Sequence, residues 1–358
     1  MAHVAAACYR TSSLWTVEVS NPAGESCKPT DDVKKKKKEK KKPKEAPKQV
    51  SRASSNGPTC TQATGGIPQP LPCPSGAPRP VHGTDKLYMD DTQCFFYEGA
   101  SLIKVATPES AEMATLVLDK TIFHPQGGGQ PTDKGTIKLK EKKGEPAVEV
   151  FRVVMVKEDR ATGIVNHHGF FSEGWSQAAL LAKAGGGGAL LVLEIDGPWR
   201  VSCARIHSAG HALDVAMLAL GYHSIRPTKG YHFPEGPYVE YEAQSADQRL
   251  SSEEKDSLPG RLTAQMAEIA AAAAGERREV AIRYLSKSEA TSLCPDADLS
   301  MFEGEGALVR VARIAGCWIP CGGTHVASLE EIGPVTVTRA KAKKNALKVS
   351  YELQGMVF

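Results

Sequence analysis

Two short motifs, far apart in the chain, limit its fold more than any other feature, because they must meet to act together. One reads RIHSAGH and holds His207 and His211; the other reads CGGTH and holds Cys321 and His325. Histidines four positions apart project from one face of an α-helix and can bind one metal ion. A thiolate and a further imidazole from a glycine-containing loop complete a ligand set that Zn²⁺ accepts. The sequence therefore predicts a zinc site where a helix and a distant loop come together.

Each motif by itself is a weak signal, and the alternative is a buried helix whose two histidines are bonded inside the core. A zinc protease of the HExxH kind is disfavoured, because Ser208 occupies the position of the glutamate that would act as general base. His325 is either the fourth metal ligand or a nearby proton-transfer group. Four protein ligands would close the site, as in structural zinc sites, whereas a catalytic zinc keeps one position open.

Basic charge is concentrated at the start of the chain. Of the 358 residues, the first 84 hold 14 Lys and Arg against 6 Asp and Glu, and the rest hold 30 against 35. Residues 34–42 contain eight lysines, a block that repels itself, and residues 51–83 are rich in Pro, Gly, Ser and Thr. Residues 1–84 are therefore predicted to be a disordered tail. It could serve as a tRNA-attracting arm, a nuclear-import signal or a solubilising spacer.

Cysteine usage and hydropathy indicate the compartment. Nine cysteines without a framework spacing suit a reducing environment. No apolar run approaches the roughly eighteen residues of a membrane-spanning helix, so no transmembrane segment is expected. Residues 1–14 are rather apolar and lack acids, which leaves a weak organelle-targeting signal as the alternative. The cytoplasm is the favoured location.

Residues 85–200 are predicted to form a small glycine-rich β-barrel or sandwich. Short β-like runs separated by turn residues favour this fold, at 116–123, 135–139, 148–156, 163–165 and 189–196. After the first run, Gly127, Gly128 and Gly129 permit positive φ angles and a close approach of the backbone. The GxxxxGK pattern is missing, so a nucleotide-binding P-loop is not expected.

Residues 201–358 are predicted to form an α+β domain with helices packed on a mainly antiparallel sheet. Apolar positions at helical spacing place His207 and His211 in an amphipathic helix that ends near Gly221. The other expected elements are helices at 261–274 and 286–293, strands at 238–242, 279–285 and 308–314, and a hairpin of 335–339 with 346–353.

Three motifs together resemble the AlaX-type alanyl-tRNA editing proteins, the free-standing relatives of the editing domains of alanyl- and threonyl-tRNA synthetases. Residues 121–135 (TIFHPQGGGQPTDKG) are similar to the family's glycine-rich motif, and RIHSAGH and CGGTHV to its paired metal motifs. The segment from Lys229 to Pro234 is also family-like. The resemblance covers roughly residue 85 to the end of the chain. It implies a glycine-rich β-barrel followed by an α+β editing domain, and a zinc-dependent hydrolase that removes serine or glycine from mischarged alanine tRNA.

The resemblance also supplies candidate site residues. The metal ligands are His207, His211, Cys321 and His325, and the candidate catalytic residues are His325, Gln130 and Thr121. Serine differs from alanine by one hydroxyl, so a pocket that bonds this hydroxyl leaves polar groups unpaired when alanine enters. The candidate substrate-binding residues are Thr121, Gly127, Gly128, Gly129, Gln130, Lys229 and Thr324.

Two features depart from the family pattern, and other functions stay open. His124 stands where the family usually has tyrosine, and Gly210 places a poor helix former between the two histidines. One alternative is a non-catalytic RNA-binding or adaptor protein with a structural zinc. Another is a deacylase that acts on mischarged threonine tRNA. The sequence predicts no oligomeric state.

Overall fold

The structure of the protein is a computed structural model, which describes residues 83–106, 113–141, 144–185, 189–245, 248–272, 278–295, 297–300, 302 and 307–356. These residues all fall within one compact unit. Except for Gly83 and Thr84, the predicted tail at 1–84 lies outside the described residues, so its disorder stays a prediction. Within the described part of the chain, no helix is long and apolar enough to cross a membrane.

The first half of the described chain is dominated by one antiparallel sheet of seven strands, in the order β2-β9-β6-β7-β8-β4-β3. In chain order these strands are β2 (Phe96–Ala100), β3 (Leu102–Ala106), β4 (Ala114–Leu118), β6 (Gly135–Lys140), β7 (Val148–Asp159), β8 (Ile164–Phe171) and β9 (Leu190–Ile195). A parallel pair, β1 (Asp85–Lys86) with β5 (Lys120–Thr121), the short η1 (Leu87–Met89) and helix α1 (Gln177–Ala184) accompany it. Alternate residues of the strands face a buried apolar cluster, as in β4, where Ala114, Leu116 and Leu118 are buried.

The predicted closed β-barrel is wrong in one respect, because this sheet is open in the described residues. Its two edge strands, β2 and β3, are not hydrogen-bonded to each other. They follow one another along the chain with only Ser101 between them, and both carry an irregular register, at Glu98/Ala100 and at Leu102/Lys104. The Ser101 backbone is bonded instead to Asp119. The edges thus meet at one bend of the chain, without the ladder that closure of a barrel needs.

The second half of the described chain is a mixture of helices and small antiparallel sheets, as predicted in its α+β class. A four-stranded sheet has the order β10-β11-β16-β15, and a three-stranded sheet has the order β12-β13-β14. The elements are α2 (Gly197–Ala219), β10 (Ile225–Tyr231), β11 (Tyr238–Ala243), α3 (Ser252–Ala272), β12 (Ala281–Ser286), α4 (Lys287–Leu293), β13 (Leu308–Ile314), β14 (Cys317–Pro320), η4 (Leu329–Ile332), β15 (Val335–Lys343) and β16 (Ala346–Leu353).

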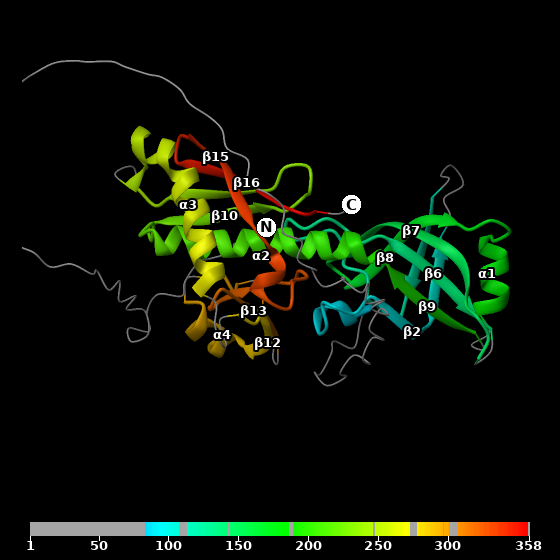
Figure 1. The fold of residues 1–358 in the computed structure, drawn as a ribbon. Helices are drawn as coiled ribbons and strands as arrows, with labels where there is room; N and C mark the ends of the chain where they lie inside the picture. Colours follow the sequence, from blue (N-terminus) through cyan, green and yellow to red (C-terminus); the bar gives the residue numbers. More distant parts are fainter. Residues whose placement is uncertain are drawn as a thin grey trace, which may run out of the picture. The chain divides into compact units, whose positions relative to one another are not determined.

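Helix α2, the long green helix in Figure 1, carries the RIHSAGH motif. Its residues are buried along most of its length. The side chain of Asp196 caps its start by accepting a hydrogen bond from the Trp199 N–H, and Pro198 occupies its first turn. It ends before Gly221, whose φ of 90° is readily adopted by glycine. The helix contacts α3, η4 and β13. The predicted helix is thus confirmed, but it begins at Gly197, so the proposed domain division between residues 200 and 201 falls inside it and stays a prediction.

The ion pair of Arg200 and Asp133 joins the start of α2 to the glycine-rich segment. Both side chains are completely buried, and the Asp133 carboxylate accepts hydrogen bonds from Arg200 and from the His124 N–H. Arg200 also donates to the carbonyl groups of Thr92 and Ile122. A buried charge pair with this many partners fixes the geometry of the loop, because breaking it would leave an uncompensated charge.

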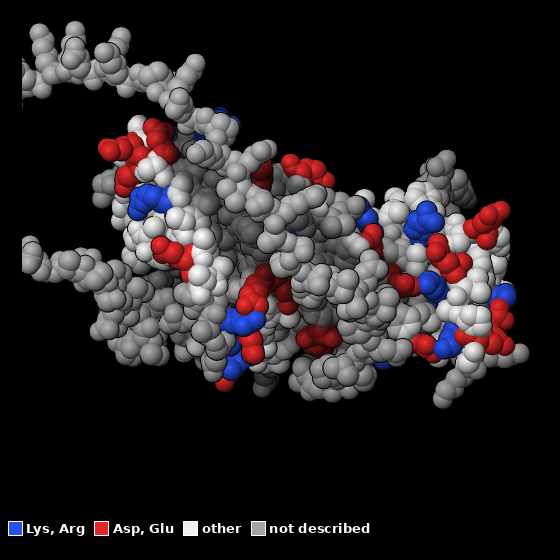
Figure 2. All heavy atoms as spheres, in the orientation of Figure 1, with Lys and Arg blue, Asp and Glu red and all other residues white. Residues whose placement is uncertain are grey.

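Charges on the visible surface are mixed. Figure 2 shows acidic and basic side chains interspersed over the described part of one face. This agrees with the near balance of charge beyond residue 84 in the sequence.

Candidate metal centre

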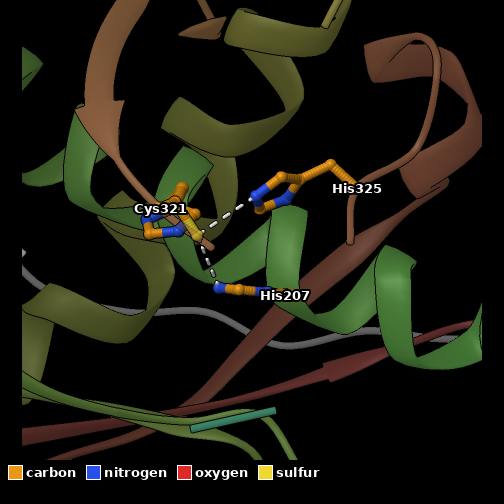
Figure 3. A group of neighbouring side chains, drawn as sticks. His207, Cys321 and His325 are labelled. Atoms are coloured by element: carbon orange, nitrogen blue, oxygen red, sulfur yellow. Dashed lines mark hydrogen bonds between the residues drawn. The ribbon is translucent and has the colours of Figure 1, made fainter. Parts of the chain in front are cut away.

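Four side chains from the two motifs converge in the structure, as the sequence predicts. The potential ligand atoms of His207, His211, Cys321 and His325 all lie within 4.8 Å of one another. The Cys321 Sγ is 3.5 Å from the His207 Nε2 and 3.3 Å from the His325 Nε2 (Figure 3). Three of the four residues are buried, and Cys321 is half-buried.

The two separations that involve Cys321 fit a bound metal ion. Tetrahedral zinc with bonds of about 2.0–2.3 Å needs ligand atoms about 3.3–3.8 Å apart, and both Cys321 distances lie in or at the edge of this range. The His211 Nε2 is buried and has no hydrogen-bond partner. Such an atom is costly to bury unless something binds it, so the donor set and its orphaned nitrogen both suit a bound cation.

Gln130 sets the orientation of the first ligand. Its Oε1 accepts hydrogen bonds from the Thr324 N–H (3.0 Å) and from His207 Nδ1 (2.8 Å), and its Nε2 donates to the Thr324 Oγ1 (2.7 Å). Because the Thr324 N–H can only donate, the atom that it meets is the amide oxygen, and His207 must carry its proton on Nδ1. The His207 Nε2 is therefore left with a free lone pair that faces Cys321. Outer partners of this kind fix a ligand's tautomer.

A tight hairpin turn of the glycine-rich segment carries Gln130 into the site. Gly127 and Gln130 exchange two backbone hydrogen bonds, and Gly128 and Gly129 between them have φ angles of 56° and 81°. Two consecutive positive φ angles are the pattern of a type I′ turn, which glycine favours. A Cβ on Gly129 would lie 2.3 Å from the Gly230 carbonyl oxygen, so the turn packs directly on β10.

His211 and His325 also have outer partners. The His211 Nδ1 lies 3.5 Å from the Asp214 Oδ2, and the Tyr241 hydroxyl donates to the other Asp214 oxygen (2.8 Å). The His325 Nδ1 lies 3.2 Å from the Ser208 Oγ, which also accepts from the Val326 N–H. Ser208 therefore positions the ligand loop against α2.

Backbone bonds hold the CGGTH loop. The His325 carbonyl accepts from the side chains of Thr92 (2.9 Å) and Gln93 (3.0 Å). The Cys321 carbonyl accepts from Arg310, and the Gly323 N–H points at the Cys321 Sγ (3.4 Å). Arg310 and Thr92 could not be identified from the sequence, because their contacts are to the loop's backbone.

The electrostatics of the cluster favour a thiolate beside imidazoles. Burial raises the pKa of the Cys321 thiol, but His207 and His325 lower it, and the net pKa is well below the ordinary value. Burial lowers the pKa of His207, and it lowers the pKa of His325 to about 3. Burial also opposes the charged form of His211, yet Asp214 and Cys321 raise its pKa to about 9. The thiolate of Cys321 and the neutral rings of His207 and His325 are the forms in which these groups bind metals, whereas the raised pKa of His211 means that this ring must release a proton when a metal binds.

Two glycines leave room for the rings of His207 and His232. A Cβ on Gly323 would lie 2.2 Å from the His207 Cε1, and a Cβ on Gly210 would lie 2.3 Å from the His232 Cε1. His232 is buried and stacks on His207, with ring centroids 4.6 Å apart, and its Nδ1 lies 2.9 Å from the Tyr351 hydroxyl. Glycine is a poor helix former, but at position 210 it is needed because the His232 ring leaves no room for a Cβ.

Other predicted site residues have other surroundings. The Thr121 hydroxyl is buried, lies 2.7 Å from the His167 Nε2 and accepts from the Phe123 N–H, so its part in substrate binding stays a prediction. Lys229 is exposed on β10. The His124 ring is buried, meets Tyr88 edge-on and has an Nδ1 without a hydrogen-bond partner. Burial lowers the pKa of His124 to about 4.

Comparison with known proteins finds alanine–tRNA ligases as relatives. The ligase of Leptothrix cholodnii is 28% identical over 263 residues, which cover 72% of this chain and 26% of the ligase. That of Methanobrevibacter smithii is 28% identical over 243 residues, or 65% and 23% of the two chains, and that of Methanopyrus kandleri is 26% identical over 263 residues, or 70% and 24%. No family model matches the chain.

The chain is therefore a distant relative of alanine–tRNA ligases, which confirms the resemblance found in the motifs. It spans about a quarter of the length of these ligases.

Proposed function

We propose that this protein is a zinc-dependent hydrolase that removes serine or glycine from mischarged alanine tRNA. The observation that carries the proposal is the convergence of His207, His211, Cys321 and His325 within 4.8 Å of one another. The relation to alanine–tRNA ligases supports a substrate that contains alanine tRNA. A bound zinc ion would supply Lewis-acid chemistry for the ester carbonyl and the attacking water.

The chain's own residues divide the remaining work. His207, His211 and Cys321 hold the metal, and His325 either completes the ligand set or transfers a proton. The hydrogen bond from the Gln130 Nε2 to the Thr324 Oγ1 leaves the Thr324 hydroxyl proton free to bond the serine side chain. Alanine cannot accept that bond, so the buried hydroxyl would go without a partner, and serine is favoured over alanine; glycine also lacks the hydroxyl, so this bond gives it no preference.

The direct test is hydrolysis of purified alanine tRNA charged with serine, glycine or alanine, with and without a chelator. We expect serine and glycine to be released and alanine retained, and activity to disappear when metal is removed. Tight binding without turnover would replace this proposal with an RNA-binding or adaptor role. Faster release of serine from threonine tRNA would keep the chemistry and change the substrate.

A second measurement separates the two roles of His325. His325→Ala should be compared with His223→Ala, an exposed control, for bound zinc and for deacylation. Normal zinc content without activity would indicate proton transfer. Loss of both would make His325 a ligand, and normal activity would remove it from the mechanism.

A further inference from the structure

The outer face of the four-stranded sheet β10-β11-β16-β15 carries an ordered array of aromatic and basic side chains. Strand alternation separates it from the core: Val239 and Tyr241 are buried, whereas Tyr238 and Glu240 are half-buried on the other side. The strand pairing arranges this outer face in rows across the sheet. One row contains Tyr231, Tyr238, Ser350 and Arg339, and the next contains Lys229, Glu240, Lys348 and Lys341.

Three aromatic rings on this side form a column. The Tyr231 ring lies between those of Phe233 and Tyr238, at centroid distances of 4.6 and 5.0 Å and interplanar angles of 17° and 16°. The Lys348 Nζ caps the column 3.3 Å from the Tyr238 centroid. Among the described residues, Phe233 has no second ring or cation partner, so the column ends there with a half-buried ring.

The residues of the column are neighbours in the sequence of a residue that packs on the metal centre. His232 stands between Tyr231 and Phe233 in the sequence and is buried, while its two neighbours are half-buried. Its ring stacks on that of His207. A group that extends the column beyond Phe233 would therefore lie close to the strand end from which His232 reaches the metal ligands.

Parallel aromatic rings bordered by lysine and arginine are suited to unpaired nucleotides, because every base has a π-face and every nucleotide a phosphate. The second row holds three cations against one acid, and Arg339 adds a cation to the first row. An acidic protein would be attracted by the cations, but its carboxylates would not stack on a column of flat rings. The observations thus favour single-stranded nucleic acid.

We propose that this face, defined by Phe233, Tyr231, Tyr238, Lys348 and Lys341, binds the single-stranded end of an RNA, with one base stacked on Phe233 and phosphates on the lysines. The inference rests on the proposed function, since there the RNA end would be the one that bears the amino acid. It adds the surface that presents this end to the metal centre.

The test uses the full chain, loaded with zinc, and a fluorescent single-stranded RNA of the alanine tRNA 3′ sequence without an amino acid. Phe233→Leu should weaken binding roughly five- to hundredfold, the range for loss of one stacked base, and Tyr238→Leu should weaken it less, because the Tyr238 ring stacks on Tyr231 and Lys348 rather than on a base. Phe170→Leu, the same change at an exposed ring on β8, is the matched control and should have no effect. Zinc content and the urea midpoint of each variant show that the site and the fold persist.

The contribution of the lysines is measured by the salt dependence of RNA binding. Lys348→Gln and Lys341→Gln should each reduce the slope of log affinity against log salt by about 0.7, whereas Lys104→Gln on β3 should not. Equal affinity of Phe233→Leu, Tyr238→Leu and the unchanged protein would overturn the inference. The inference would also be overturned if the lysine variants weakened the binding of an acidic peptide as much as the binding of the RNA, while the ring variants weakened neither.

Because the probe carries no ester, this experiment measures binding alone, and its result is independent of the result of the deacylation assay. Ring-dependent RNA binding without any hydrolysis would retain the surface and refute the proposed function. Hydrolysis with unchanged affinity in the ring variants would do the reverse.

Discussion

Replacement of Gly210 by alanine is the sharpest test of how the metal centre is packed. In an ordinary helix interior this change stabilises a protein by up to about 1 kcal/mol, because glycine is the poorer helix former. Here the new Cβ would lie 2.3 Å from the His232 Cε1, 2.8 Å from its Nδ1 and 3.0 Å from the Tyr351 hydroxyl. The added methyl group must displace a buried ring.

His232 has little freedom to move away. Its N–H donates to the Gly129 carbonyl (2.8 Å), its Nδ1 is bonded to Tyr351, and Gly230 packs against its other edge. Overpacking of a filled core costs about 1–3 kcal/mol, and loss of one buried hydrogen bond costs about 1 kcal/mol. After subtraction of the gain in helix propensity, the free energy of unfolding should fall by about 1–3 kcal/mol.

Gly260→Ala is the matched control, because Gly260 lies inside α3 and a Cβ there would meet nothing within 4 Å. It should raise the free energy of unfolding by up to about 1 kcal/mol. Urea unfolding of the zinc-loaded chains would give both values from their midpoints and slopes. If Gly210→Ala were as stable as Gly260→Ala, the packing of His232 on α2 would be refuted.

Three further changes test the network around the ligands. Gln130→Ala removes the acceptor of the His207 Nδ1 proton and should weaken zinc binding about 10–100-fold in a chelator competition, while an unchanged affinity would contradict its orienting role. Removal of zinc should lower the urea midpoint, because the ion binds only the folded chain, and an equal midpoint would mean that the cluster holds no metal. His167 should destabilise the protein in acid: burial lowers its pKa from 6.5 to about 4, so the unfolded chain binds the extra proton, and stability should fall below pH 6.5 by about 2 kcal/mol at pH 5. Measured against pH, unfolding of His167→Gln should lack this loss, and an identical profile would refute the assignment.

The convergence of the four candidate ligands could be predicted from the sequence because its chemistry is local. His207 and His211 need only one helix, and apolar spacing identifies that helix. Cys321 and His325 need only a short loop. The pairing of these two motifs came from the chemistry of zinc and from family resemblance, and the structure brings all four ligand atoms together.

The closure of the first sheet could not be predicted in the same way. The run of short strands indicates an antiparallel sheet, but closure depends on how the edge strands β2 and β3 are paired, and these pair with β9 and β4 rather than with each other. Pairing of this kind joins segments that are distant in the sequence, so neither segment shows it by itself. The same reason hid the bond between Thr121 and His167, two residues that only the folded sheet makes neighbours.

The outer partners of the candidate ligands explain why the site could be predicted from the sequence but the orientation of its side chains could not. His207 is oriented by Gln130, His325 lies against Ser208, and His211 lies beside Asp214. Gln130 comes from a hairpin turn far from both metal motifs, and only Ser208 and Asp214 lie on the ligand helix itself. Each of the three histidines therefore lies against a residue that is not a candidate ligand, and substitution of these partners should alter metal affinity before it alters the fold. A site held in this way separates two properties, because the types of the candidate ligands select the ion, while neighbouring side chains that are not ligands orient the three histidine rings.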